Sequence, residues 1–148
     1  MTTVSVPLPT RKLSPNNRPK RAIAAIYRRA ADDYQKECRG HLLVAGLKRI
    51  HVPVMIQYEF FTAYTKVRSG GGLTRIKDDR YRPLDADNAI SAMKPFQDLL
   101  VKDGHIPGDE SRYVLVAPPI IHSAKKSGVT QGVKVWFLTP EEWRKRCR

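Results

Sequence analysis

The pattern of apolar and polar residues predicts strands in four parts of the chain. Residues 3 to 8 alternate between polar and apolar side chains in the way of a short edge strand, which prolines end. Residues 51 to 67 are rich in β-branched and aromatic side chains and predict one long strand. The apolar runs at 112 to 121 and 132 to 138 predict further strands. In the long strand the apolar side chains fall on one side: Val52, Val54, Ile56, Tyr58 and Phe60.

Apolar residues that recur at three- and four-residue steps predict two amphipathic helices. One extends from about residue 19 to 45 and the other from 87 to 103, and each is followed by a glycine, Gly46 or Gly104, that suits a helix end. Pro95 should kink the second helix, because proline cannot donate a backbone hydrogen bond to the preceding turn. The apolar stripe of this second helix comprises Ala89, Met93, Phe96 and Leu100.

The remaining segments complete the predicted fold. Thr139 as N-cap, Pro140 in the first turn and two early glutamates predict a short C-terminal helix. Residues 68 to 83, RSGGGLTRIKDDRYRP, combine three consecutive glycines with basic side chains and predict a flexible basic loop. The order of strands and helices indicates a single α+β domain over residues 1 to 148, with a mixed sheet covered by helices.

The charge of the chain favours a polyanionic partner. Its 27 Lys and Arg residues against 14 Asp and Glu residues give a net charge of +13. Such a field attracts nucleic acid, although a merely soluble basic protein would have the same composition. No apolar stretch approaches the roughly 20 residues that span a bilayer, so we expect no membrane partner. Without a secretory signal, and with only Cys38 and Cys147, we expect free thiols and a cytoplasmic setting.

Acidic residues concentrate in one stretch of this basic chain, DADNAISAMKPFQDLLVKDGHIPGDE at 85 to 110. Asp85 and Asp87 are two residues apart, so in an extended segment both side chains point to one side and can share a cation. The alternative is that they cap the helix that follows, a role worth about 1 kcal/mol. Lys94, two helical turns after Asp87, can reach back toward this acidic end, or it pairs with Asp98 one turn later.

Asp109 and Glu110 follow the same predicted helix and precede a strand. If that strand ran back beside the strand before Asp85, Asp109 would lie close to Asp85. Carboxylates brought together repel one another, so a hard divalent cation such as Mg²⁺ is the natural compensation. A positive surface for phosphate beside an acidic pocket for metal predicts a metal-dependent nuclease or another phosphoryl-transfer enzyme.

Two separated motifs resemble the RusA family of Holliday-junction resolvases, which are common in bacteria and their phages. The first is DADN with a later lysine and GHIPGDE before a strand, and the second is LSPNNR, which is similar to that family's Pro-Ser-Asn-Asn-Arg loop. The resemblance implies a RusA-like fold and an intertwined homodimer. Two active sites would then cut opposing strands of a four-way DNA junction during recombination and repair, leaving 5′-phosphate ends.

The resemblance also implies roles for individual residues. Asp85, Asp87 and Asp109 correspond to the family's Mg²⁺ ligands, with Mn²⁺ able to substitute, and Lys94 corresponds to the lysine that supports catalysis. An activated water would attack phosphorus in line while Lys94 offsets the charge that builds on the phosphate. Glu110 either joins the metal site or has no part in it. No small-molecule cofactor is expected.

Polar and basic residues elsewhere are candidates for contacts with the DNA backbone, although each is as readily an ordinary solvated side chain. These candidates are Asn16, Asn17, Arg18, Arg80, Arg82, Lys125 and Lys126. Two other functions stay open at this point. One is a non-catalytic, basic nucleic-acid-binding protein whose acidic residues serve only as caps, and the other is a metal-dependent nuclease that acts mainly on forks or flaps.

Overall fold

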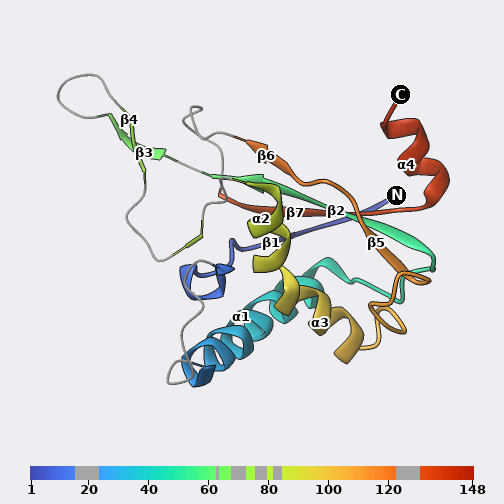
Figure 1. Cartoon of the computed structure of the whole chain (residues 1–148), viewed down its shortest axis with the longest axis horizontal. Helices are drawn as coiled ribbons and strands as arrows, with labels where there is room; N and C mark the ends of the chain where they lie inside the picture. The colour runs from blue at the N-terminus through green and yellow to red at the C-terminus, as the bar shows by residue number, and fades with distance from the viewer. Residues whose placement is uncertain (16–23, 63, 68–72, 76–79, 82–84, 123–130) are drawn as a thin grey trace.

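A five-stranded mixed sheet forms the centre of the molecule in a computed structural model of the chain (Figure 1). The structure describes residues 1–15, 24–62, 64–67, 73–75, 80–81, 85–122 and 131–148, with only the backbone of 64–67 and 73–75. The strands of this sheet are β1 (Thr2–Val6), β2 (Val54–Phe61), β5 (Val114–Val116), β6 (Ile120–His122) and β7 (Gly132–Leu138). Strand β7 lies antiparallel between β1 and β2, whereas β5 and β6 both pair in parallel with β2.

One face of the sheet is apolar and faces two helices. Helices α1 (Ala24–Ala45) and α3 (Lys94–Lys102) lie on the same side of the sheet (Figure 1). Val52 was expected on this face, but it precedes the strand and is 36% exposed. The predicted alternation of β2 is otherwise confirmed, because its buried side chains on this face are Val54, Ile56, Tyr58 and Phe60. The result is a single small α+β domain with a mixed sheet, as predicted.

Specific contacts hold α3 between the sheet and α1. Phe96 of α3 packs edge-to-face against Tyr58 of β2, with ring centroids 6.3 Å apart. On the other side, the Gln35 amide of α1 donates a hydrogen bond of 2.9 Å to the carbonyl of Pro95. Both aromatic side chains are fully buried, so the position of α3 is set by core packing.

The predicted helix over 87 to 103 is two helices, α2 (Ala86–Ala92) and α3, which Met93 separates. Pro95 lies in the first turn of α3, where its missing N–H costs nothing, so the expected kink is a complete break. The apolar stripe is confirmed, since all of its side chains are fully buried: Ala89, Met93, Phe96 and Leu100.

The predicted helix ends are also observed. Gly46 and Gly104 follow α1 and α3 with φ angles of 66° and 76°, the left-handed region that glycine adopts without strain. The expected start of the first helix near residue 19 lies outside the described residues. Helix α4 (Pro140–Arg146) has the predicted cap, because Thr139 and Glu142 form a reciprocal capping box. Among the described residues, no helix is long and apolar enough to cross a bilayer.

Two strand predictions are wrong in detail. The run at 51 to 67 is divided between β2 and β3 (Tyr64–Val67), and β3 pairs instead with β4 (Leu73–Arg75) in a separate hairpin. Part of the predicted basic loop at 68 to 83 is therefore a strand. Alternation indicates which residues are extended, but it does not indicate which neighbour they pair with.

The run at 112 to 121 is likewise two short strands, β5 and β6. Pro118 and Pro119 lie between them and cannot donate to the ladder, so pairing with β2 is interrupted there. The gap is bridged by a side chain, since the Gln57 amide donates a hydrogen bond of 2.9 Å to the carbonyl of Pro118.

Candidate active site

Asp85 is the N-cap of α2 and is exposed. Its Oδ1 accepts a hydrogen bond of 2.9 Å from the backbone N–H of Asn88, and its Oδ2 accepts one of 2.8 Å from the Asn88 amide. The capping alternative is therefore confirmed for Asp85. Each carboxylate oxygen can accept more than one hydrogen bond, so capping leaves Asp85 with capacity for a further ligand.

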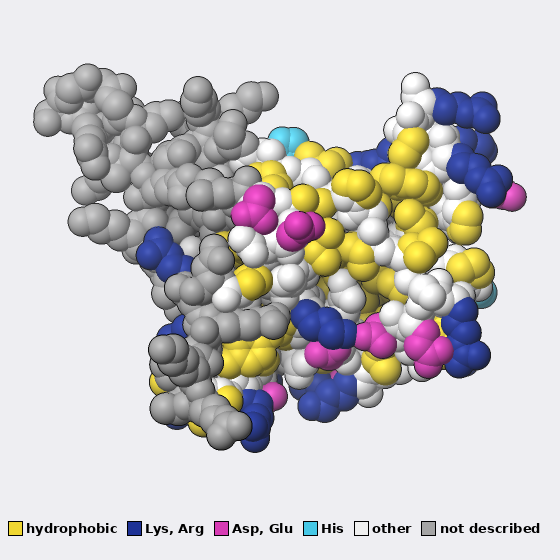
Figure 2. All heavy atoms as spheres, in the orientation of Figure 1, with side chains coloured by type: hydrophobic (Ala, Val, Ile, Leu, Met, Phe, Trp, Pro, Cys, Tyr) yellow, Lys and Arg dark blue, Asp and Glu magenta, His cyan; other side chains and the backbone are white. Residues whose placement is uncertain are grey.

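Asp87 lies in the first turn of α2 and is also exposed. Within the part of the chain that the structure describes, its carboxylate makes no hydrogen bond or ion pair. The positive end of the helix dipole favours a negative charge at this position. Figure 2 shows acidic side chains over the start of α2, apart from a mixed band of acidic and basic side chains along α3 and the turn that follows it.

Lys94 contacts two carboxylates, and these include a predicted site residue. Its ammonium forms an ion pair of 3.0 Å with Asp98 and contacts the carboxylate of Asp109. Hydrogen bonding to Asp109 raises the pKa of Lys94, and the same bond lowers the pKa of the Asp109 carboxyl. The expected pairing with Asp98 is confirmed, but among the described residues Lys94 makes no contact with Asp85 or Asp87, and its second carboxylate partner is Asp109.

Asp109 follows a turn that is anchored in the core. Ile106 is buried, and its N–H donates a hydrogen bond of 3.2 Å to the carbonyl of Leu100 at the end of α3. This turn directs Asp109 back toward the start of α3. The strand that follows Asp109, β5, pairs with β2, which is part of the long strand predicted before Asp85, but it runs parallel to β2 and does not run back beside it.

Glu110 lies beside the turn and has a different partner from Asp109. Its Oε2 accepts a hydrogen bond of 2.5 Å from Nε of Arg112, and both side chains are mostly exposed. The guanidinium of Arg112 also lies over the ring of Tyr113, 4.6 Å from the centroid. Glu110 therefore takes part in a local surface contact.

The predicted ligands match a divalent cation in chemistry but are not assembled around one position. Carboxylate oxygens suit Mg²⁺, and Asp109 already holds a cation, the ammonium of Lys94. Among the described residues, which include all three aspartates, no group of three or more Asp, Glu, His or Cys side chains could hold a metal ion. Metal binding by Asp85, Asp87 and Asp109 stays a prediction.

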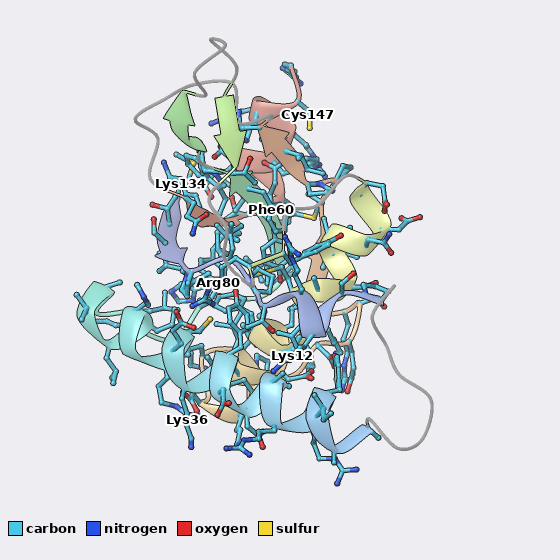
Figure 3. All side chains as sticks on the ribbon, turned by 90° about the vertical axis from the view of Figure 1, so that its left-hand side faces the viewer. Lys12, Lys36, Phe60, Arg80, Lys134 and Cys147 are labelled. Carbon is cyan, nitrogen blue, oxygen red and sulfur yellow. The ribbon has the colours of Figure 1, made fainter. Side chains whose placement is uncertain are left out.

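Arg80 is engaged within the protein. Its guanidinium makes two hydrogen bonds to the Glu37 carboxylate, of 2.7 and 3.1 Å, and one of 2.9 Å to the carbonyl of Leu8. Figure 3 shows Arg80 between α1 and the strands. Its contact with phosphate stays a prediction, and the other candidate DNA contacts lie outside the described residues: Asn16, Asn17, Arg18, Arg82, Lys125 and Lys126.

A polar cluster that the sequence did not predict lies on the opposite face of the sheet. The Glu59 carboxylate accepts hydrogen bonds of 2.8 Å from Trp136 Nε1 and from His122 Nε2. Lys134 and Arg146 lie over the Trp136 ring, 4.2 and 4.0 Å from its centroid. The signal for it was the polar half of the alternation in β2 and β7, which indicates the residues but not their pairing.

Comparison of the sequence with protein-family models and with curated proteins gives no match. The resemblance to the RusA family therefore consists of the two sequence motifs alone.

Proposed function

We propose that this protein is a Mg²⁺-dependent, structure-selective endodeoxyribonuclease that resolves four-way DNA junctions by paired strand cleavage with 5′-phosphate products. The observation that supports this most is the contact between Lys94 and Asp109, which brings together a predicted site residue at the start of α3 and one that follows the turn after α3. Exposed Asp85 and Asp87 lie at the start of the adjoining helix α2. The net charge of +13 suits a polyanionic substrate.

In this proposal each site residue has one task. Asp85, Asp87 and Asp109 hold Mg²⁺ or Mn²⁺, which when bound supplies Lewis-acid chemistry and an activated water. Lys94 offsets the negative charge that grows on the phosphate during attack. The capping bonds from Asn88 orient the Asp85 carboxylate before any ligand arrives.

The proposal also covers the oligomeric state of the protein and its cellular compartment. Two equivalent strands of a junction are best met by two equivalent sites, so the active species is a homodimer with two-fold symmetry. A reducing, cytoplasmic compartment suits the two free cysteines, buried Cys38 and exposed Cys147. Burial raises the pKa of the Cys38 thiol to about 12, which makes it unreactive.

A second candidate is a non-catalytic, basic nucleic-acid-binding protein. The observation that favours it is the capping role of Asp85, together with the pairing of Glu110 with Arg112. In that case Mg²⁺ would have no effect on binding, and no strand would be cut.

The decisive experiment is Mg²⁺-dependent cleavage of a labelled four-way junction by the wild-type protein and by Asp87→Asn. The variant should lose activity by about 100-fold or more, because a ligand carboxylate is lost, and should still bind the junction. Asp33→Asn, the same change at an exposed position on α1, is the matched control and should cut normally.

Substrate choice is tested in the same assay with fork, flap and linear duplex. If forks or flaps were cut in preference to four-way junctions, they would become the proposed substrate in place of the junction. Full cleavage by Asp87→Asn would remove Asp87 from the site, and tight binding without cleavage by the wild-type protein would favour the second candidate.

A further inference from the structure

The ammonium of Lys94 is shared between two carboxylates of different origin. Asp98 lies on α3 one turn after Lys94, and Asp109 comes from the turn that follows the helix. The three side chains are 44%, 51% and 43% exposed, respectively. Ion pairs at this level of exposure contribute little to stability, so the ammonium can leave either carboxylate without disturbing the fold.

This arrangement conflicts with the two tasks that the proposed function gives to Lys94 and Asp109. While Lys94 holds Asp109, the carboxylate is already neutralised and the ammonium is not free for phosphate. The ammonium occupies the position beside Asp109 that the proposed function gives to a metal ion. A divalent cation and Lys94 therefore compete for one carboxylate, and each weakens the binding of the other by the same factor.

Asp98 offers Lys94 a second partner on the same helix. The spacing of four residues on one helix keeps the two side chains adjacent. Helix α3 is fixed by its buried side, where Phe96, Leu99 and Leu100 are fully buried. Asp98 therefore stays beside Lys94 whichever cation Asp109 holds.

We propose that Asp98 is a positioning residue that receives Lys94 when Asp109 passes to the metal. The inference rests on the proposed function and deepens it, because metal binding then releases Lys94 from the acidic turn. Asp98 lowers the cost of that release. Without Asp98 the ammonium has Asp109 as its remaining carboxylate partner among the described residues, and it competes with metal more strongly.

The test is a double-mutant cycle in which Mn²⁺ affinity is measured from the electron paramagnetic resonance signal of the free ion. Lys94→Met should bind Mn²⁺ about two- to fivefold more tightly than the wild-type protein, because the competitor is gone. Asp98→Asn should bind it more weakly by a similar factor. In the Lys94→Met background, Asp98→Asn should have no effect. Lys102→Met, an exposed lysine on the same helix, is the matched control and should change the affinity less.

The double mutant separates this inference from simple charge effects. If Asp98 acts only through its charge, Asp98→Asn weakens Mn²⁺ binding equally with and without Lys94, and that additive result would overturn the inference. Junction cleavage measured in parallel shows which proposal has failed. Cleavage by the wild-type protein with an additive cycle removes the inference alone, whereas absence of both Mn²⁺ binding and cleavage removes the proposed function as well.

Discussion

Helices α2 and α3 have an inner side that faces the core and an outer side that faces solvent, and different interactions act on the two sides. The inner side is fully buried and packs against β2 and α1, as in the contact between Phe96 and Tyr58. The outer side carries exposed Asp87 together with Asp85 and Lys94, and the side-chain contacts of the latter two are exposed to solvent. Packing in the interior admits one arrangement, whereas exposed ion pairs exchange at little cost. The inner side thus sets where the candidate site lies, and the outer side is free to change partners.

Phe96→Ala tests the inner side and should have the largest effect on stability. Removing a fully buried aromatic ring leaves a cavity against Tyr58, so the free energy of unfolding should fall by about 3–5 kcal/mol. Urea denaturation followed by circular dichroism measures this. Asp98→Asn, on the outer side of the same helix, should stay within about 0.5 kcal/mol of the wild-type protein. Equal losses in the two variants would show that the two sides do not differ as described.

Substitutions of Asp85 separate its observed role as a helix cap from its proposed role as a metal ligand, because asparagine and aspartate are equally good N-caps. Asp85→Ala should lower the free energy of unfolding by about 1 kcal/mol, whereas Asp85→Asn should preserve it to within a few tenths. Both variants should lose junction cleavage if the carboxylate holds metal. Retention of full activity by Asp85→Asn, measured with the same labelled junction, would reduce Asp85 to a cap.

Features that depend on neighbours in sequence were predictable. The buried stripe from Ala89 to Leu100, the glycine ends of α1 and α3, and the capping box at Thr139 each follow from residues within a few positions of one another. The motif DADN likewise contains its own cap, since Asp85 and Asn88 bond across one turn. Local geometry determines these features, so one chain is sufficient to predict them.

Features that depend on distant segments were not predictable. The pairing of β5 with β2, the hairpin of β3 with β4, and the bonds from Arg80 to Glu37 join parts of the chain whose sequence patterns do not refer to one another. The contact of Lys94 with Asp109 belongs to the same class, because it depends on how the turn after α3 packs its Ile106. Sequence spacing indicated that Lys94 could reach acidic residues, but the tertiary fold decides which ones.

The ion pair between Arg39 and Asp103 lies between the inner and outer sides. Breaking it should have the smallest effect on stability, and that effect should depend on pH. Arg39 of α1 donates hydrogen bonds of 2.7 and 3.0 Å to Asp103, which follows α3, and these bonds hold the pKa of the Asp103 carboxyl below its usual range. A carboxyl with a lower pKa in the folded state binds fewer protons there than in the unfolded chain. Its contribution to stability is therefore complete above the unfolded pKa of about 4 and is lost as the pH falls through the folded value.

Asp103→Asn should accordingly lower the Tm at pH 7 by no more than about 3 °C, since both partners are partly exposed to solvent. The difference in Tm from the wild-type protein should shrink as the pH falls below about 4, because acid then protonates Asp103 in the wild-type protein as well. Thermal melts of both proteins across this range measure the difference directly. Asp33→Asn, on the exposed side of α1, should leave the Tm nearly unchanged. A difference that grew toward low pH would mean that the contact between α1 and α3 does not depend on the ionised carboxylate.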